Sequence, residues 1–150
     1  MVASALFSFL HFAAALAIAA TLFFEWLTLS RTPTLDDARR LQAADRWYGM
    51  AAGVLLIVGF VRVFQFEKGS SYYFHNTFFL LKLALFVAVG LISIYPTIRF
   101  IAWGKLTRQG QAPQLADAEF KRLRQALGTE LLLLLGIVLC ASLMAKGLGA

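Results

Sequence analysis

The sequence holds one cysteine, Cys140, and two histidines, His11 and His75. One cysteine excludes an intramolecular disulfide framework and any Cys-rich metal site, so metal chemistry would have to rest on His, Met, Glu or Lys. The signatures Gly-x-x-x-x-Gly-Lys, His-Glu-x-x-His and Gly-x-Ser-x-Gly are absent as well. Phosphoryl transfer, zinc-dependent proteolysis and serine hydrolase chemistry therefore have no support in the sequence.

Charged residues are also scarce. They make up 15% of the 150 residues, against 60% hydrophobic residues, and the mean hydropathy is +0.73. These values lie outside the usual range for a soluble domain and indicate a membrane protein. The net charge of +6 is carried between the apolar runs and not along a basic stripe interleaved with aromatics, so nucleic-acid binding is not expected.

Four apolar runs of spanning length predict the fold class. We expect an all-α integral membrane four-helix bundle that forms a single domain over 1–150, because each run can cross the hydrocarbon core as a helix. Residues 1–10 carry no Lys or Arg, so the first run is expected to be a retained span and not a signal peptide. The predicted spans cover about 5–28, 47–65, 73–101 and 120–146.

The connections carry their own signals. Thr34 or Asp36 is expected to cap a short amphipathic helix that lies at the membrane interface before the second span. Pro96 is expected to kink or end the third span, and Pro113 suits the first turn of the helix that leads into the fourth.

Lys and Arg predict the orientation. They concentrate in the first and third connections, whereas the opposite side has only Arg62, Lys68 and Lys146. Basic connections stay in the cytoplasm, so both termini are expected outside, which in a bacterium is the periplasm. The chain is thus expected to be a multi-pass protein of the bacterial cytoplasmic (inner) membrane, with the lipid bilayer as its first partner.

Ionisable groups inside a bilayer are costly and are functional candidates by default. His11, Lys82, Glu25 and Glu130 all fall within or beside the predicted spans, and His75 falls near an interface. Each could instead serve the structure alone, for example by hydrogen bonding to a neighbouring helix.

The histidines suggest a cofactor. The first and third spans run in the same direction, and each carries a histidine near its outward end. We therefore predict that His11 and His75 are both axial metal ligands of haem b, enclosed by the apolar bundle. Arg62 and Lys68 would offset the propionates. Lys82, seven residues after His75 and so on the same helix face, would tune the potential or bind an anionic partner.

This hypothesis describes a small electron-transfer or oxidoreductase protein with a membrane or periplasmic redox partner. Whether it is an enzyme stays open at this stage. One alternative is a transporter or copper-handling protein that uses His11, Met144 and Cys140. Another is a non-catalytic membrane assembly partner, or a homo-oligomer, that packs through small residues such as Gly49, Gly53 and Gly59.

Several segments carry a family resemblance: Phe9-Leu10-His11-Phe12, Asp45-Arg46-Trp47-Tyr48-Gly49, Tyr73-Phe74-His75-Asn76, Lys82-Leu83-Ala84-Leu85-Phe86 and Tyr95-Pro96-Thr97-Ile98-Arg99. With them the chain resembles an uncharacterised family of bacterial four-span membrane proteins, domain of unknown function 2214. More distantly, the first-helix histidine and the third-helix His-then-Lys pattern are similar to those of haem-binding bacterial protoporphyrinogen oxidases and copper-resistance D-type membrane domains. In those families the third-helix histidine and lysine stand closer together than His75 and Lys82.

Overall fold

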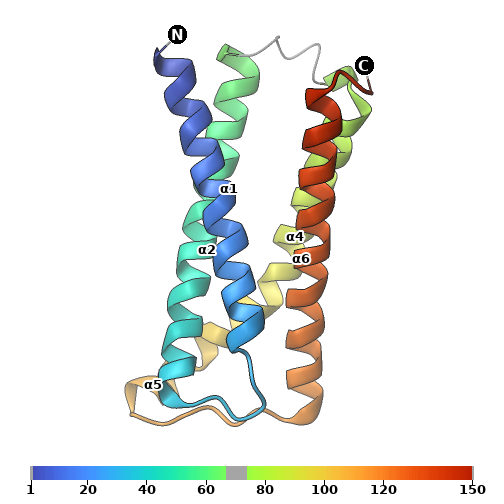
Figure 1. Ribbon diagram of the computed structural model, residues 1–150. Coiled ribbons are helices and arrows are strands. Elements are labelled where there is room, and N and C mark those ends of the chain that lie inside the picture. The colour runs from blue at the N-terminus through green and yellow to red at the C-terminus, as the bar shows by residue number, and fades with distance from the viewer. Residues whose placement is uncertain (1, 67–73, 150) are drawn as a thin grey trace.

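The computed structural model describes residues 2–66 and 74–149 (Figure 1). Within these residues the chain is helical, with four long helices, a short helix and one π-helical turn: α1 (Val2–Thr28), α2 (Leu35–Val61), η1 (Arg62–Phe66), α4 (Thr77–Ala102), α5 (Gly104–Arg108) and α6 (Asp117–Ala145). Each of the four long helices is long and apolar enough to cross a membrane. The predicted all-helical, multi-pass architecture is therefore confirmed.

The long helices form two pairs. The first pair joins α1 with α2, the second joins α4 with α6, and both chain termini lie at one end of the bundle (Figure 1). We call this the terminal end. The opposite end, which carries residues 29–34, α5 and residues 109–116, is the loop end. Which end faces the periplasm stays a prediction from the basic connections.

Helix α2 begins at a capping box. The Thr34 hydroxyl accepts a hydrogen bond from the Asp37 backbone N–H at 3.1 Å, and the Asp37 carboxylate accepts one from the Thr34 N–H at 3.0 Å. This satisfies two backbone donors that a helix start leaves open. The helix then runs unbroken to Val61. The expected interfacial helix is thus the first part of α2, because no Gly or Pro interrupts residues 35–48.

Pro96 does not end its helix, whether it kinks the helix stays a prediction, and Pro113 does not lie in the first turn of the next helix. Helix α4 continues through Pro96 to Ala102, and the Pro96 ring is buried. Pro113 lies in the connection before α6, which begins only at Asp117. The acidic Asp117 and Glu119 in the first turn of α6 favour a helix start at that point, since they complement the positive end of the helix dipole.

Packing is concentrated at the loop end. The main core there includes Leu22, Leu41, Phe100, Leu123 and Leu127, each no more than 1% exposed. The terminal end has only a small described cluster, in which Val63 and Phe79 pack with Met144. Among the residues that the structure describes, the buried apolar packing is thus more extensive at the loop end than at the terminal end. Large apolar side chains on the outer faces of all four long helices are exposed, as expected for surfaces that contact lipid.

Candidate functional site

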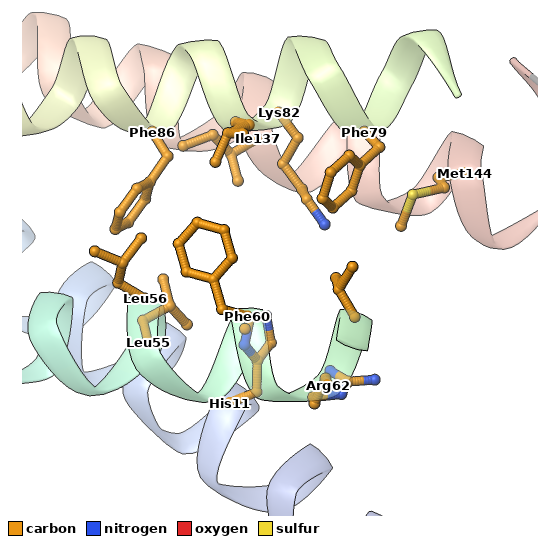
Figure 2. Close-up of a pocket in the computed structure, with 13 residues that line it drawn as sticks. His11, Leu55, Leu56, Phe60, Arg62, Phe79, Lys82, Phe86, Ile137 and Met144 are labelled. Atoms are coloured by element: carbon orange, nitrogen blue, oxygen red, sulfur yellow. The ribbon is translucent and has the colours of Figure 1, made fainter. Parts of the chain in front are cut away.

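A pocket lies between the two helix pairs toward the terminal end (Figure 2). We call it the terminal-end pocket, and its volume is about 150 Å³. Its walls are mostly aliphatic and aromatic, and three basic side chains, His11, Arg62 and Lys82, reach it. The other described lining residues are Leu55, Leu56, Gly59, Phe60, Val63, Phe79, Leu83, Phe86, Ile137 and Met144.

His11 continues the buried face of α1. That face runs through Ala14, Ile18, Leu22 and Glu25, at the spacings of three and four residues that keep side chains on one side of a helix. The half-buried imidazole packs on α2 at Gly59. A Cβ added to Gly59 would lie 3.5 Å from His11 Cε1 and 3.7 Å from Nδ1. The missing side chain of Gly59 thus leaves room for the ring beside the pocket.

Lys82 enters the pocket from α4. It lies three residues after Phe79 and four before Phe86, so the three share the inward face of the helix. The Lys82 ammonium points into the pocket and lies 5.2 Å from the centroid of the Phe79 ring (Figure 2). This distance is within the range of a cation–π contact. A positive charge is therefore held against an aromatic face in largely apolar surroundings.

Arg62 approaches from the opposite pair of helices. It is the first residue of η1, where α2 gives way to the π-helical turn. Its guanidinium carbon lies 5.9 Å from the centroid of the Phe12 ring, again within cation–π range. Two cations and an imidazole thus line one apolar pocket. Such a pocket suits a molecule with an apolar body and negatively charged groups.

The second predicted ligand lies elsewhere. His75 is exposed and sits in a helical turn before α4, and the described lining of the pocket does not include it. His11, by contrast, is nine residues into α1, or about 14 Å along the helix at 1.5 Å per residue. The structure thus brings His11, Arg62 and Lys82 together but leaves His75 apart. The predicted Lys68 lies outside the described residues.

The three residues of the copper-handling alternative, His11, Met144 and Cys140, do not all lie at one site. Met144 lines the pocket together with His11, whereas Cys140 is buried and is not part of the described lining. In residues 2–66 and 74–149, no group of three or more His, Cys, Asp and Glu side chains is placed to hold a metal ion.

The two intramembrane glutamates lie toward the loop end, in a second polar cluster. Glu25 and Glu130 are buried there, and the Tyr48 hydroxyl donates a hydrogen bond of 3.1 Å to Glu130 Oε2. In the same region the Thr97 hydroxyl donates to Asp45 Oδ1 at 2.6 Å. The sequence interpretation missed Tyr48, Asp45 and Thr97. The available signal is Asp45 three positions before Tyr48, but the charged residues before residue 47 favour an interfacial helix when the sequence is considered alone.

Comparisons with known proteins add a family. Neither the curated proteins nor the solved structures include one that matches the chain. The more distant resemblance to protoporphyrinogen oxidases and copper-resistance domains therefore stays a prediction. A family model described as "Predicted membrane protein (DUF2214)" matches residues 3–149. Since this match covers nearly the whole chain, the protein belongs to that family of predicted membrane proteins.

Proposed function

We propose that the protein is a small haem protein of the bacterial inner membrane, in which His11 binds the iron of haem b in the terminal-end pocket. Arg62 and Lys82 would pair with the two propionates. The observation that carries the proposal is the convergence of one imidazole and two cations on a single apolar pocket. With both termini in the periplasm, the pocket would lie toward the periplasmic side.

The chemistry of the lining fits this group. Imidazole is a common axial ligand of haem iron, and the side chains of Phe60, Phe79 and Phe86 supply aromatic walls for a flat macrocycle. The volume of about 150 Å³ is smaller than the range of about 300–1,000 Å³ that encloses a bound small molecule. Binding therefore requires the helix pairs to part at the terminal end, where the described buried apolar residues form the small cluster of Val63 and Phe79.

His75 is the residue that the sequence predicts as the second ligand of the haem iron. Because it is exposed and precedes α4, ligation by His75 requires the turn at residues 74–75 to move toward the pocket. Ligation by His11 needs no such movement. The two histidines therefore make separable contributions, and variants of each can be compared.

Bound haem would supply reversible one-electron transfer. The residues of the chain would hold it and set its surroundings. Lys82 places a positive charge inside an apolar pocket, which attracts anionic groups and favours the more reduced state of a redox centre beside it. Arg62 lies near the terminal end, where a membrane or periplasmic redox partner would approach.

Visible spectroscopy tests the proposal. The protein is purified in mild detergent from cells with adequate haem supply, and spectra are recorded before and after dithionite. The proposal expects a sharp reduced α-band that is lost in His11→Ala. If His75 is the second ligand, the spectrum of His75→Ala should change to that of an iron with one protein ligand fewer. An unchanged band would show that His75 is not a ligand. Arg62→Gln is expected to weaken haem retention without removing the band.

Other outcomes would overturn the proposal. A colourless protein that binds copper through His11 and Met144 would favour the copper-handling or transporter class. A protein that binds neither haem nor copper would favour a non-catalytic assembly partner. Retention of an unchanged α-band in His11→Ala would place any haem outside the terminal-end pocket.

A further inference from the structure

Two glutamates lie fully inside the bundle toward the loop end. The proposed haem pocket gives them no role, because neither belongs to its described lining. Glu25, on α1, is 2% exposed, and Glu130, on α6, is 1% exposed. Both carboxyl groups are therefore shielded from lipid and from water by the packed helices. Tyr48, on α2, is 5% exposed and donates its hydroxyl hydrogen bond to Glu130 Oε2 at 3.1 Å.

Each glutamate also keeps one buried oxygen that the described residues do not satisfy. Oε1 of Glu25 and Oε1 of Glu130 have no hydrogen-bond partner in the described part of the chain. The carboxyl groups of Asp45 and Glu130 both lie within electrostatic reach of Glu25. Native proteins rarely leave buried polar atoms unsatisfied, so these two oxygens point to an additional bound species.

The nearby cations are occupied elsewhere. The Arg124 guanidinium donates a hydrogen bond to the Trp26 backbone carbonyl and stacks over the Trp26 ring. Arg99 pairs with Glu119, from which it is separated by 2.5 Å. Among the described residues no ion pair is found for Glu25 or Glu130. Two adjacent acids without a counter-ion cannot both stay ionised inside a membrane at low cost.

A cavity lies beside this cluster and shares Tyr48 with it. It lies between α2 and α4, has a volume of about 260 Å³, and is lined by the hydroxyl-bearing residues Tyr48, Ser93 and Thr97 together with small and apolar residues. The lining is otherwise apolar, and the hydroxyls of Tyr48, Ser93 and Thr97 already donate to Glu130, Gly90 and Asp45. Their oxygens can still accept hydrogen bonds from water that enters the cavity. Leu56 and Phe86 line both this cavity and the terminal-end pocket, so the two spaces adjoin.

Tyr48 is the link between the cavity and the carboxyl groups. It lines the cavity and also hydrogen bonds to Glu130, whereas neither glutamate belongs to the described cavity lining. A small organic cation in the cavity would thus be separated from both carboxyl groups. No metal-binding group of three acidic, His or Cys side chains is found among the described residues either. Because both carboxyl groups are buried and neither lines the cavity, the cation that best fits them is the smallest one, a proton.

We propose that Glu25 and Glu130 form a proton-binding site, which is loaded from the cavity between α2 and α4 through the hydroxyl group of Tyr48. In the loading step Tyr48 transfers its hydroxyl proton to Glu130 and takes up a proton from a hydronium ion that enters the cavity, which leaves a neutral water molecule. One carboxylate becomes a neutral carboxylic acid and the tyrosine is unchanged. This site is independent of the proposed haem site.

Charged and titratable groups come from every long helix around the pair. Helix α1 contributes Glu25 and α2 contributes Asp45 and Tyr48, while α6 contributes Glu130 and Arg124. Helix α4 faces the cluster with the hydroxyls of Ser93 and Thr97 and, nearer the loop end, carries Arg99 in its ion pair with Glu119. Of these groups, the two glutamates alone combine full burial with an unsatisfied oxygen in the described chain.

Infrared difference spectroscopy on the full chain in lipid nanodiscs tests the proposal. A pH titration is followed through the carbonyl stretching band of protonated carboxylic acids, in H₂O and D₂O. The band is expected to grow as the pH falls and to lose intensity in both Glu25→Gln and Glu130→Gln. Glu119→Gln is the matched control, because Glu119 pairs with Arg99 and is not part of the site. A titrating band that survives both buried-site variants would overturn the proposal.

Kinetics test the role of Tyr48. After a pH jump, Tyr48→Phe is expected to slow the appearance of the band by about tenfold or more while leaving its final intensity, since a proton-relay group accelerates transfer. An unchanged rate would remove Tyr48 from the loading route. Addition of Na⁺, K⁺ or tetraphenylphosphonium at constant pH is expected to leave the band unchanged. Loss of the band with any of these ions would show a general cation site and overturn the proposal of a proton site.

Discussion

The hydrogen bond between Tyr48 and Glu130 joins residues 82 positions apart in the sequence, and its removal gives a sharp prediction. Tyr48→Phe deletes the donor and keeps the ring. Glu130 Oε1 already lacks a described partner, so the variant leaves both oxygens of a buried carboxyl group unsatisfied. Leaving a buried polar group unsatisfied costs about 1–3 kcal/mol. For a chain of this size, each kcal/mol corresponds to a fall of about 2–4 °C in the midpoint of thermal unfolding.

The assay is thermal unfolding in detergent followed by circular dichroism, with a double-mutant cycle. Tyr95→Phe is the control, because Tyr95 is a half-buried tyrosine on α4 that packs against the core. In a Glu130→Leu background the acceptor is gone, so Tyr48→Phe is expected to cost less than about 0.5 kcal/mol. Glu130→Leu alone leaves the buried Tyr48 hydroxyl without its acceptor, whereas the double variant removes both partners and is expected to be neutral or stabilising relative to Glu130→Leu. An equal loss from Tyr48→Phe in both backgrounds would refute the reasoning.

Three further predictions concern Gly59 beside His11, the helix cap Asn76 and the ion pair between Arg99 and Glu119. Gly59→Ala is expected to keep the haem band, because the added Cβ makes only ordinary contact with His11 at 3.5 Å, whereas Gly59→Leu displaces the imidazole and abolishes the band. Asn76→Ala removes a helix cap and a hydrogen bond to a backbone carbonyl, so thermal unfolding should show a loss of about 1–2 kcal/mol, and Asn76→Asp a smaller one. Arg99→Ala breaks a partly exposed pair with Glu119 and should cost less than about 1 kcal/mol, falling with added salt.

Hydropathy and the cost of burying charge could predict the architecture and part of the site. Four apolar runs correspond to the four long helices. Because cations are rare inside membranes, the sequence also marks Lys82 as a candidate site residue, and Lys82 lines the pocket. Helical periodicity alone also relates Lys82 to Phe79 and Phe86. These features depend on local composition and on one helix at a time, which is why a single sequence reveals them.

The points at which helices begin and the contacts between helices could not be predicted in this way. The start of α2 at Leu35 depends on a capping box and a good helix-forming segment, but charged residues in that segment suggested a separate interfacial helix. The depth of His75 depends on where α4 begins, and Asn76 fixes this point as the helix cap. Tyr48 has no intramembrane charge to mark it, and its role becomes visible only when α2 and α6 pack together.

Imidazole rescue of a His11→Gly variant tests the central claim most directly. The substitution leaves a space next to Gly59 in the terminal-end pocket, where a free imidazole can take the place of the missing side chain. We predict that His11→Gly loses the reduced α-band and that added imidazole restores it in a saturable manner, with no effect of imidazole on the wild-type band. A His11→Gly protein that keeps its haem spectrum without imidazole would contradict the assignment of His11 as the iron ligand.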